Sequence, residues 1–199
     1  MQSRPDAPYK NDLGRERRDD RIESRWMRAF IGLGGNLPGT HAALGRAVAE
    51  LRAIGQVVHT SSLYSSAPRD LVDQPDFTNA AIEFESDLEP DALLLELKRL
   101  ELSLGRDPHG IRFGPRLIDL DILAIDGRCV EDQQLDLIVP HPRLHERRFA
   151  LEPLAELDPN LRPWRRCADV RRDVTVADLL PTVADQEVRR VADPNWADR

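Results

Sequence analysis

The chain has 199 residues, of which 41% are hydrophobic, and a formal net charge of −7 at pH 7. This composition supports one folded domain and excludes a wholly disordered chain. The negative charge argues against broad binding to nucleic acid or to a membrane surface. Two cysteines, Cys129 and Cys167, are too few for a disulfide framework or a zinc cluster, so a reducing, cytoplasmic location is expected. No apolar run suggests a membrane span or a signal peptide.

Charge separates the first 25 residues from the rest, because 13 of them are acidic or basic and few are large and apolar. Such a segment cannot bury enough surface to offset the entropy lost on ordering. We therefore expect a disordered tail at 1–25, a single domain at 26–190 and a short C-terminal tail at 191–199.

Hydrophobic periodicity and turn residues predict the elements of this domain. In chain order they are strand 28–33, helix 41–53, strand 56–65, loop 67–75, strand 77–86, helix 89–104, loop 106–115, strand 117–125, loop 140–147, helix 149–157 and one or two helical turns at 176–183. The order strand, helix, strand, strand, helix, strand is typical of the α+β class. It predicts a ferredoxin-like antiparallel sheet with helices packed on one face, plus a C-terminal helical extension.

The most informative stretch is the D-x-D of the predicted strand 117–125. Because side chains alternate along a strand, Asp119 and Asp121 should project together from one face, about 7 Å apart at the backbone. The apolar residues should face the helices: Ile118, Leu120, Ile122 and Ala124. Two such carboxylates repel each other, and a magnesium ion bound with phosphate oxygens would relieve the repulsion. The alternative is an exposed sheet face with two solvated acids.

Basic residues favour the metal interpretation, because they gather in the loops on either side of this strand. Arginine makes up 26 of the 28 basic residues. The first loop holds Arg106, Arg112 and Arg116, and the second holds His141, Arg143, His145, Arg147 and Arg148. Arginines beside a metal pair suit a bound polyphosphate, although we interpret Arg143 and Arg148 as ordinary solvated surface. Neither a dinucleotide fingerprint nor a P-loop motif is present.

Four blocks identify a resemblance that covers roughly residues 28–160. They read F-I-G-L-G-G-N-L at 30–37, Y-S-S-A-P-R-D-L-V-D-Q-P-D-F-T-N at 64–79, F-G-P-R-L-I-D-L-D-I-L at 113–123 and V-P-H-P-R-L-H-E-R-R-F-A-L-E-P-L at 139–154. With these blocks in this order, the chain resembles the 6-hydroxymethyl-7,8-dihydropterin pyrophosphokinases of folate biosynthesis.

The resemblance implies transfer of a diphosphate from ATP to the hydroxymethyl group of the dihydropterin, with release of AMP. It implies two magnesium ions on Asp119 and Asp121, and a catalytic group formed by these aspartates with Arg106 and Arg116. The implied ATP contacts are Lys98, Glu101, Arg106, Arg112, Arg116, Ile122, His141 and Arg147. The implied pterin contacts are Ser66, Ala67, Arg69, Phe77, Asn79 and Phe149. A monomer is expected.

Two other classes of protein stay open at this point. A metal-dependent nucleotidyltransferase or cyclase can also place paired aspartates on a ferredoxin-like sheet, but it would attack the α-phosphorus and give Phe77, Asn79 and Phe149 no role. A regulatory module that only binds a nucleotide would have no need of two aspartates on one face. From the residues alone, Phe77 and Phe149 would be interpreted as core, and no general base is identified.

Overall fold

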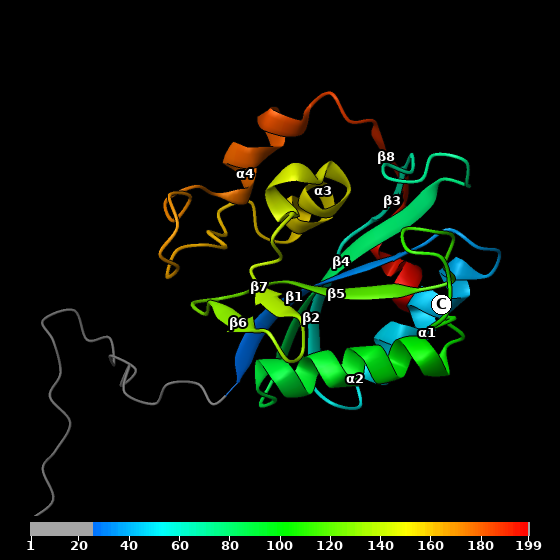
Figure 1. Cartoon of the computed structure of the whole chain (residues 1–199), viewed down its shortest axis with the longest axis horizontal. Helices are drawn as coiled ribbons and strands as arrows, with labels where there is room; N and C mark the ends of the chain where they lie inside the picture. Colours follow the sequence, from blue (N-terminus) through cyan, green and yellow to red (C-terminus); the bar gives the residue numbers. More distant parts are fainter. Residues whose placement is uncertain (1–25, 199) are drawn as a thin grey trace, which may run out of the picture.

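The computed structural model describes residues 26–198, in which six antiparallel strands form the main sheet (Figure 1). Its order is β5-β1-β4-β3-β8, and β2 also pairs with β4. The strands are β1 Met27–Gly35, β2 Gln56–Thr60, β3 Leu63–Ser66, β4 Phe77–Ser86, β5 Asp119–Ile125 and β8 Val188–Ala192, with β6 Val130–Asp132 and β7 Leu137–Val139 in a separate hairpin. The helices are α1 Thr40–Leu51, α2 Pro90–Ser103, α3 Arg148–Leu157 and α4 Val176–Leu179, with 3-10 turns η1 Leu144–Glu146, η2 Leu180–Val183 and η3 Pro194–Asp198. The predicted tail at 1–25 lies outside the described residues.

Helices α1 and α2 cover one face of the sheet, which confirms the predicted α+β class (Figure 1). Each helix buries residues at a spacing of three and four, so one side of the helix meets the sheet. These buried residues are Ala43, Leu44, Ala47, Val48 and Leu51 of α1 and Leu93, Leu97 and Leu100 of α2. They pack on alternate residues of β1, β4 and β5, including Ile31, Ile82 and Leu120. The first core therefore lies between this face and the two helices.

The predicted C-terminal extension lies on the opposite face, where α3 and α4 are drawn in Figure 1. A second core forms there between the sheet and the extension. Its fully buried members are Phe30, Ala81, Ala124, Leu144, Leu151, Leu154 and Val176. Helix α3 packs chiefly on β4, so the part of this face over the start of β5 is left for the cavity described below.

One residue of the predicted strand 117–125 faces the other way from the prediction. The pairing of β1 with β5 is irregular, since Ile31 lies opposite Ile122 whereas Phe30 lies opposite Ala124, which leaves Leu123 as an extra residue. Such a bulge reverses the alternation of side chains beyond it. Ala124 therefore packs in the second core, and Ile125 takes its place towards the helices.

The C-terminal residues also differ from the prediction, because 191–198 belong to the domain. Strand β8 pairs with β3 at the edge of the sheet, with Ala192 opposite Leu63. Beyond it, the indole of Trp196 donates a hydrogen bond to the carbonyl of Ser61, 2.8 Å away, and Ala197 is buried. Charged and polar residues dominate this segment, so it lacks the alternation of apolar and polar residues that predicts a strand. None of the helices between residues 26 and 198 has the length and apolarity that a membrane crossing requires.

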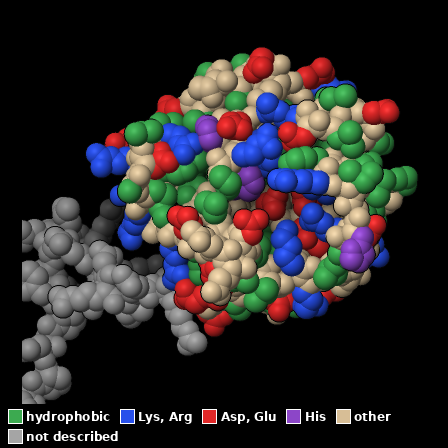
Figure 2. All heavy atoms as spheres, viewed as in Figure 1, with side chains coloured by type: hydrophobic (Ala, Val, Ile, Leu, Met, Phe, Trp, Pro, Cys, Tyr) green, Lys and Arg blue, Asp and Glu red, His purple; other side chains and the backbone are tan. Residues whose placement is uncertain are grey.

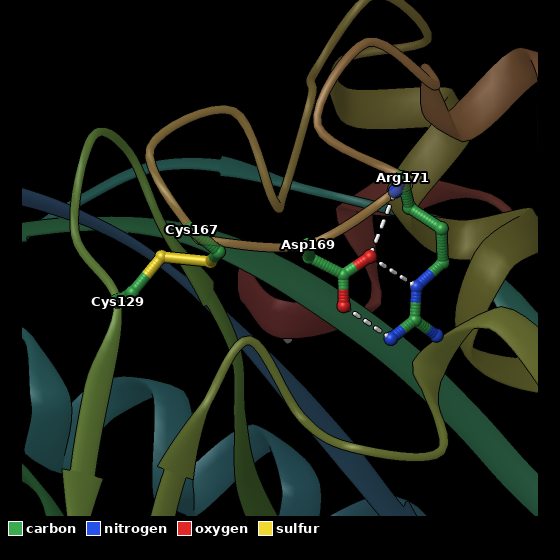
Figure 3. Close-up of a disulfide and its surroundings, with 4 residues drawn as sticks. All are labelled: Cys129, Cys167, Asp169 and Arg171. Carbon is green, nitrogen blue, oxygen red and sulfur yellow. Dashed lines mark hydrogen bonds and ion pairs between the residues drawn. A yellow bond between two sulfur atoms is a disulfide. The ribbon is translucent and has the colours of Figure 1, made fainter.

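The two cysteines are joined in a disulfide between Cys129 and Cys167, whose Cα atoms lie 5.6 Å apart. The bond differs from the free thiols that a reducing location implies. It connects the turn after β5 to the loop that leads to α4 (Figure 3).

Candidate active site

Strand pairing places the key side chains in rows across the sheet. Gly34 of β1 lies opposite Asp119 of β5 on one side and Asn79 of β4 on the other, while Gly32 lies opposite Asp121. Directly paired residues of an antiparallel sheet share a face, and neighbouring strands are about 4.8 Å apart. The two glycines therefore leave a bare floor between the carboxylates and the amide.

This floor opens into a cavity of about 440 Å³, over which basic, acidic and histidine side chains gather at the centre of the face in Figure 2. The cavity brings together most of the site residues expected from the sequence. Those that line it are Ser66, Ala67, Arg69, Phe77, Asn79, Lys98, Arg106, Arg116, Asp119, Asp121, His141, Arg147 and Phe149. Residues as far apart in the sequence as Gly32 and Ala150 thus meet in one place.

Three expected residues do not line the cavity. Ile122 is buried in the first core on the helix side of β5, and Arg112 is exposed, with its guanidinium 5.0 Å from the ring centroid of Phe113. Glu101 of α2 is only 2% exposed and lies beneath the floor. Ile122 and Arg112, two of the ATP contacts that the resemblance implies, therefore lie outside the lining of the cavity.

The two aspartates have unequal surroundings. Asp119 is paired with both Arg106 and Arg116, and its Oδ2 lies 2.9 Å from Arg116 Nη1. Asp121 has a cation only at the limit of an ion pair, with Lys98 Nζ 3.9 Å from Oδ1. Its side chain is 40% exposed and lines the cavity. Desolvation by the surrounding protein, and then the charge of Asp119, raise the pKa of Asp121 to about 6.

These carboxylates suit a magnesium ion. Hard oxygen ligands are what magnesium prefers, and it usually takes one or two carboxylates with phosphate oxygens and waters completing its shell. Within residues 26–198 no cluster of three or more His, Cys, Asp or Glu could hold a metal. A metal at Asp119 and Asp121 would therefore need oxygens from a ligand, and its charge would relieve the repulsion that raises the pKa of Asp121.

Glu101 supports this arrangement from below. Its Oε1 accepts a hydrogen bond from the backbone N–H of Leu120, 2.6 Å away, and from Lys98 Nζ, 3.1 Å away, and it also pairs with Arg106. Burial raises the pKa of Glu101, while Lys98 and the Leu120 amide oppose this rise. The carboxylate thus fixes the backbone of β5 between the two aspartates, and it holds Lys98 and Arg106 at the lining of the cavity.

The loop 140–147 contributes Arg147, a cation that has no carboxylate partner among the described residues. Arg147 makes no ion pair with a carboxylate of the described chain; its Nη1 lies 3.4 Å from His141 Nε2. Burial, and then the neighbouring Arg143, lower the pKa of Arg147. Burial and Arg147 also lower the pKa of His141 to about 4, so His141 is neutral at pH 7, and its Nδ1 accepts a hydrogen bond from the backbone N–H of Arg143, 3.1 Å away.

The other end of the cavity has two aromatic rings and a buried amide. Asn79 is 6% exposed, and its Nδ2 donates to Ser66 Oγ, 3.0 Å away, so its oxygen remains for a ligand. Each ring is next to an arginine of the polar end: Arg116 lies 5.5 Å from the centroid of Phe77, and Arg147 lies 5.6 Å from that of Phe149. The half-buried rings are suited to stack on a flat heteroaromatic ligand.

Sequence reasoning missed the residues that join the cavity's loops. Asn36, at the end of β1, accepts from Arg116 N (2.9 Å) and donates to Gln74 Oε1 (2.9 Å) and to the carbonyl of Pro75 (3.0 Å). Gln74 donates in turn to the carbonyl of Phe113, 2.9 Å away. Asn36 follows a glycine pair and Gln74 follows an aspartate, so both resembled ordinary turn residues.

Comparison with known proteins agrees with this geometry. The family model described as 7,8-dihydro-6-hydroxymethylpterin-pyrophosphokinase matches residues 30–159. The chain is 39% identical over 165 residues to the 2-amino-4-hydroxy-6-hydroxymethyldihydropteridine pyrophosphokinase of Bacillus subtilis, covering 82% of this chain and 89% of that protein. To the protein of the same name from Methylorubrum extorquens it is 41% identical over 136 residues, covering 67% and 84%.

Solved structures show the same fold at low identity. The crystal structure of Plasmodium falciparum HPPK-DHPS, wild type with pteroate, matches with a TM-score of 0.59 and 12% identity, over 80% of this chain and 45% of that one. The chain thus spans less than half the length of that protein. The family match over residues 30–159 and the identity to two relatives along most of their length place this chain in the 7,8-dihydro-6-hydroxymethylpterin-pyrophosphokinase family.

Proposed function

We propose that the cavity carries out the family's pyrophosphokinase reaction, the transfer of diphosphate from ATP to the hydroxymethyl oxygen of 6-hydroxymethyl-7,8-dihydropterin, with release of AMP, as a step of folate biosynthesis. One observation carries the proposal: a single cavity of about 440 Å³ is lined both by the carboxylate–arginine cluster and by the aromatic–amide group. An acceptor alcohol and a polyphosphate can therefore meet inside it. A nucleotidyltransferase would leave Phe77, Asn79 and Phe149 without a purpose.

At the aromatic end, Phe77 and Phe149 hold the dihydropterin ring by stacking, and the free oxygen of Asn79 accepts a hydrogen bond from its edge. Ser66 fixes the amide through the hydrogen bond from Asn79 Nδ2. Ala67 and Arg69 line the same end of the cavity. These contacts would hold the pterin in the same cavity as the carboxylates, where its hydroxymethyl group can meet the phosphates of ATP.

At the polar end, the arginines bind the phosphates of ATP. Arg147 has no carboxylate partner among residues 26–198 and is the first candidate for a phosphate oxygen, whereas Arg106 and Arg116 are shared with Asp119. Asp119 and Asp121 would hold magnesium, two ions in our proposal, which when bound neutralises phosphate charge and fixes the phosphate geometry. Catalysis then rests on positioning and charge, with no covalent intermediate on the protein.

The product distribution tests the reaction class. The protein is incubated with magnesium, ATP and 6-hydroxymethyl-7,8-dihydropterin, and nucleotides and pterins are separated by chromatography. AMP equal in amount to a diphosphorylated pterin is expected, and neither should form when the pterin is omitted. The Asp121→Asn variant serves as the matched inactive control. ADP, pyrophosphate, or AMP that forms without the pterin would refute the assignment.

We further propose a monomer that acts in the cytoplasm without nucleic-acid or membrane partners. The net charge of −7 argues against binding to nucleic acid. The use of ATP as a substrate supports a cytoplasmic location. In such a location the disulfide would be exposed to cellular thiols.

A further inference from the structure

The disulfide and the loop that it anchors have no place in the proposed reaction. Cys167 lies in residues 162–174, the loop between α3 and α4. This loop carries five arginines. Most of this loop is exposed, and Val170 is 98% exposed. Its hydrogen bonds from backbone N–H groups at 165, 167, 172 and 174 are to carbonyls within the loop itself. The loop therefore depends on a few side chains for its place on the protein.

One of these side chains is Arg171, which contacts His145, a neighbour in sequence of the cavity residue Leu144. Its Nη1 lies 2.7 Å from Nδ1 of His145, and its guanidinium lies 4.6 Å from the ring centroid of Trp164. Asp169 fixes the guanidinium in this orientation, accepting from Nε at 2.9 Å and from Nη2 at 2.6 Å, as Figure 3 shows. Trp164 is buried in the second core, so Arg171 is held between a rigid ring and His145.

His145 belongs to η1, the turn that bears the ATP side of the cavity. Its neighbours in η1 are Leu144, which lines the cavity, and Glu146, and the turn stands between His141 and Arg147. The backbone hydrogen bonds from Leu144 N to His141 O and from Arg147 N to Leu144 O make this segment one unit. A shift of His145 would therefore move both cavity residues.

We propose that Arg171 is a positioning residue for His141 and Arg147, and that the Cys129–Cys167 disulfide makes this support dependent on redox state. The inference rests on the proposed function, in which these two residues face ATP. The disulfide ties the loop to the turn after β5, four residues from the end of that strand. A cellular dithiol breaks the S–S bond by exchange: it supplies two electrons and two protons, leaves two cysteine thiols and becomes a disulfide itself. The loop then keeps the contacts of Arg171 and the packing of Trp164 and Val174 on the second core.

Other contacts also hold η1, so the expected effect is moderate. Gln186 Nε2 donates to the carbonyl of Glu146, 2.9 Å away, and Arg69 donates to the same carbonyl. We expect reduction by dithiothreitol to weaken ATP binding about three- to tenfold, to leave pterin binding unchanged, and to speed amide exchange of residues 141–147.

The experiment compares oxidised and reduced wild type with a Cys129→Ser, Cys167→Ser double variant and with Arg171→Ala. Dissociation constants for ATP and for the pterin are measured by calorimetry, and exchange by mass spectrometry. Arg171→Ala should reproduce the reduced state, Arg171→Lys should recover part of the affinity, and the exposed neighbour Arg172→Ala should match oxidised wild type. The serine double variant should no longer respond to dithiothreitol.

Two results would overturn the inference: exchange of 141–147 that is the same in the oxidised and reduced proteins, or a response to dithiothreitol that persists in the serine double variant. Failure of the oxidised wild type to bind ATP would instead refute the proposed function. In that case the exchange comparison still decides whether the loop supports η1. If the double variant does not fold, reduced wild type and Arg171→Ala give the same comparison.

Discussion

Asp121→Asn should stabilise the protein in the absence of magnesium and ATP while abolishing turnover. The substitution keeps the shape of the side chain and removes the charge that the fold disfavours. Because the pKa of Asp121 is raised from 3.8 to about 6, the folded protein binds this proton more tightly than the unfolded chain does. Relative to a neutral side chain, the carboxylate therefore destabilises the fold above pH 6, and the difference disappears below about pH 4.

The magnitude follows from the same difference in pKa. Two pH decades correspond to about 3 kcal/mol, and screening by solvent in the cavity, where 40% of the side chain is accessible, reduces this to about 1–2 kcal/mol. In a domain of this size that raises the melting temperature by about 3–6 °C. Thermal denaturation at pH 7.5, 6.0 and 4.0 measures the change, with magnesium chelated throughout.

Asp119→Asn is the matched control, since it makes the same chemical change two residues away on the same face. Asp119 is paired with Arg106 and Arg116, so its removal leaves two cations less neutralised and should lower the melting temperature at pH 7.5. Opposite signs for the two variants are the expected result. A lower melting temperature for Asp121→Asn, or a gain that does not depend on pH, would refute the reasoning.

The remaining predictions concern the rings, the buried acid and the glycines. Phe149→Ala should weaken pterin binding about fivefold or more with little effect on ATP, measured by calorimetry, because a stacking contact contributes about 1 kcal/mol; loss of thermal stability with unchanged pterin affinity would show that the ring is core instead. Glu101→Ala should lower the free energy of unfolding by about 3 kcal/mol, measured in urea, because it leaves the buried amide of Leu120 without its acceptor and removes one of the two carboxylates that pair with Arg106; a neutral effect would contradict this. Gly35→Ala should prevent stable folding, since its Cβ would lie 2.4 Å from the carbonyl of Leu117, whereas Gly45→Ala, with open space in α1, should stabilise by about 0.5–1 kcal/mol in the same assay.

The fold class and the carboxylate pair could be predicted because both depend on the spacing of apolar residues within single helices and strands. Alternation in 117–125 correctly placed Asp119 and Asp121 on one face, opposite Leu120. The same rule was wrong for Ala124, because the bulge at Leu123 arises from the pairing with β1 and has no signal within β5 itself.

Features that depend on distant pairing could not be predicted from the sequence. Gly32 and Gly34 matched no phosphate-binding fingerprint, and their role emerges only when they lie opposite the aspartates some 85 residues later. Arg143, interpreted as solvated surface, makes a partly exposed ion pair of 3.4 Å with Asp70, a residue 73 positions earlier in the chain. Both cases require knowledge of which strands or loops are neighbours.

The charges of the cavity explain why a stable fold would keep such a site. Without a ligand, Asp121 has too little positive charge nearby, and Arg147 has no acid partner in the part of the chain that the structure describes, so each is held in a state that lowers stability. The two groups do not neutralise each other through an ion pair in the described chain. A metal–polyphosphate complex supplies what both lack, a cation for the carboxylate and an anion for the guanidinium. Binding energy is thus available to ATP with its metal because the folded protein leaves these two charges uncompensated.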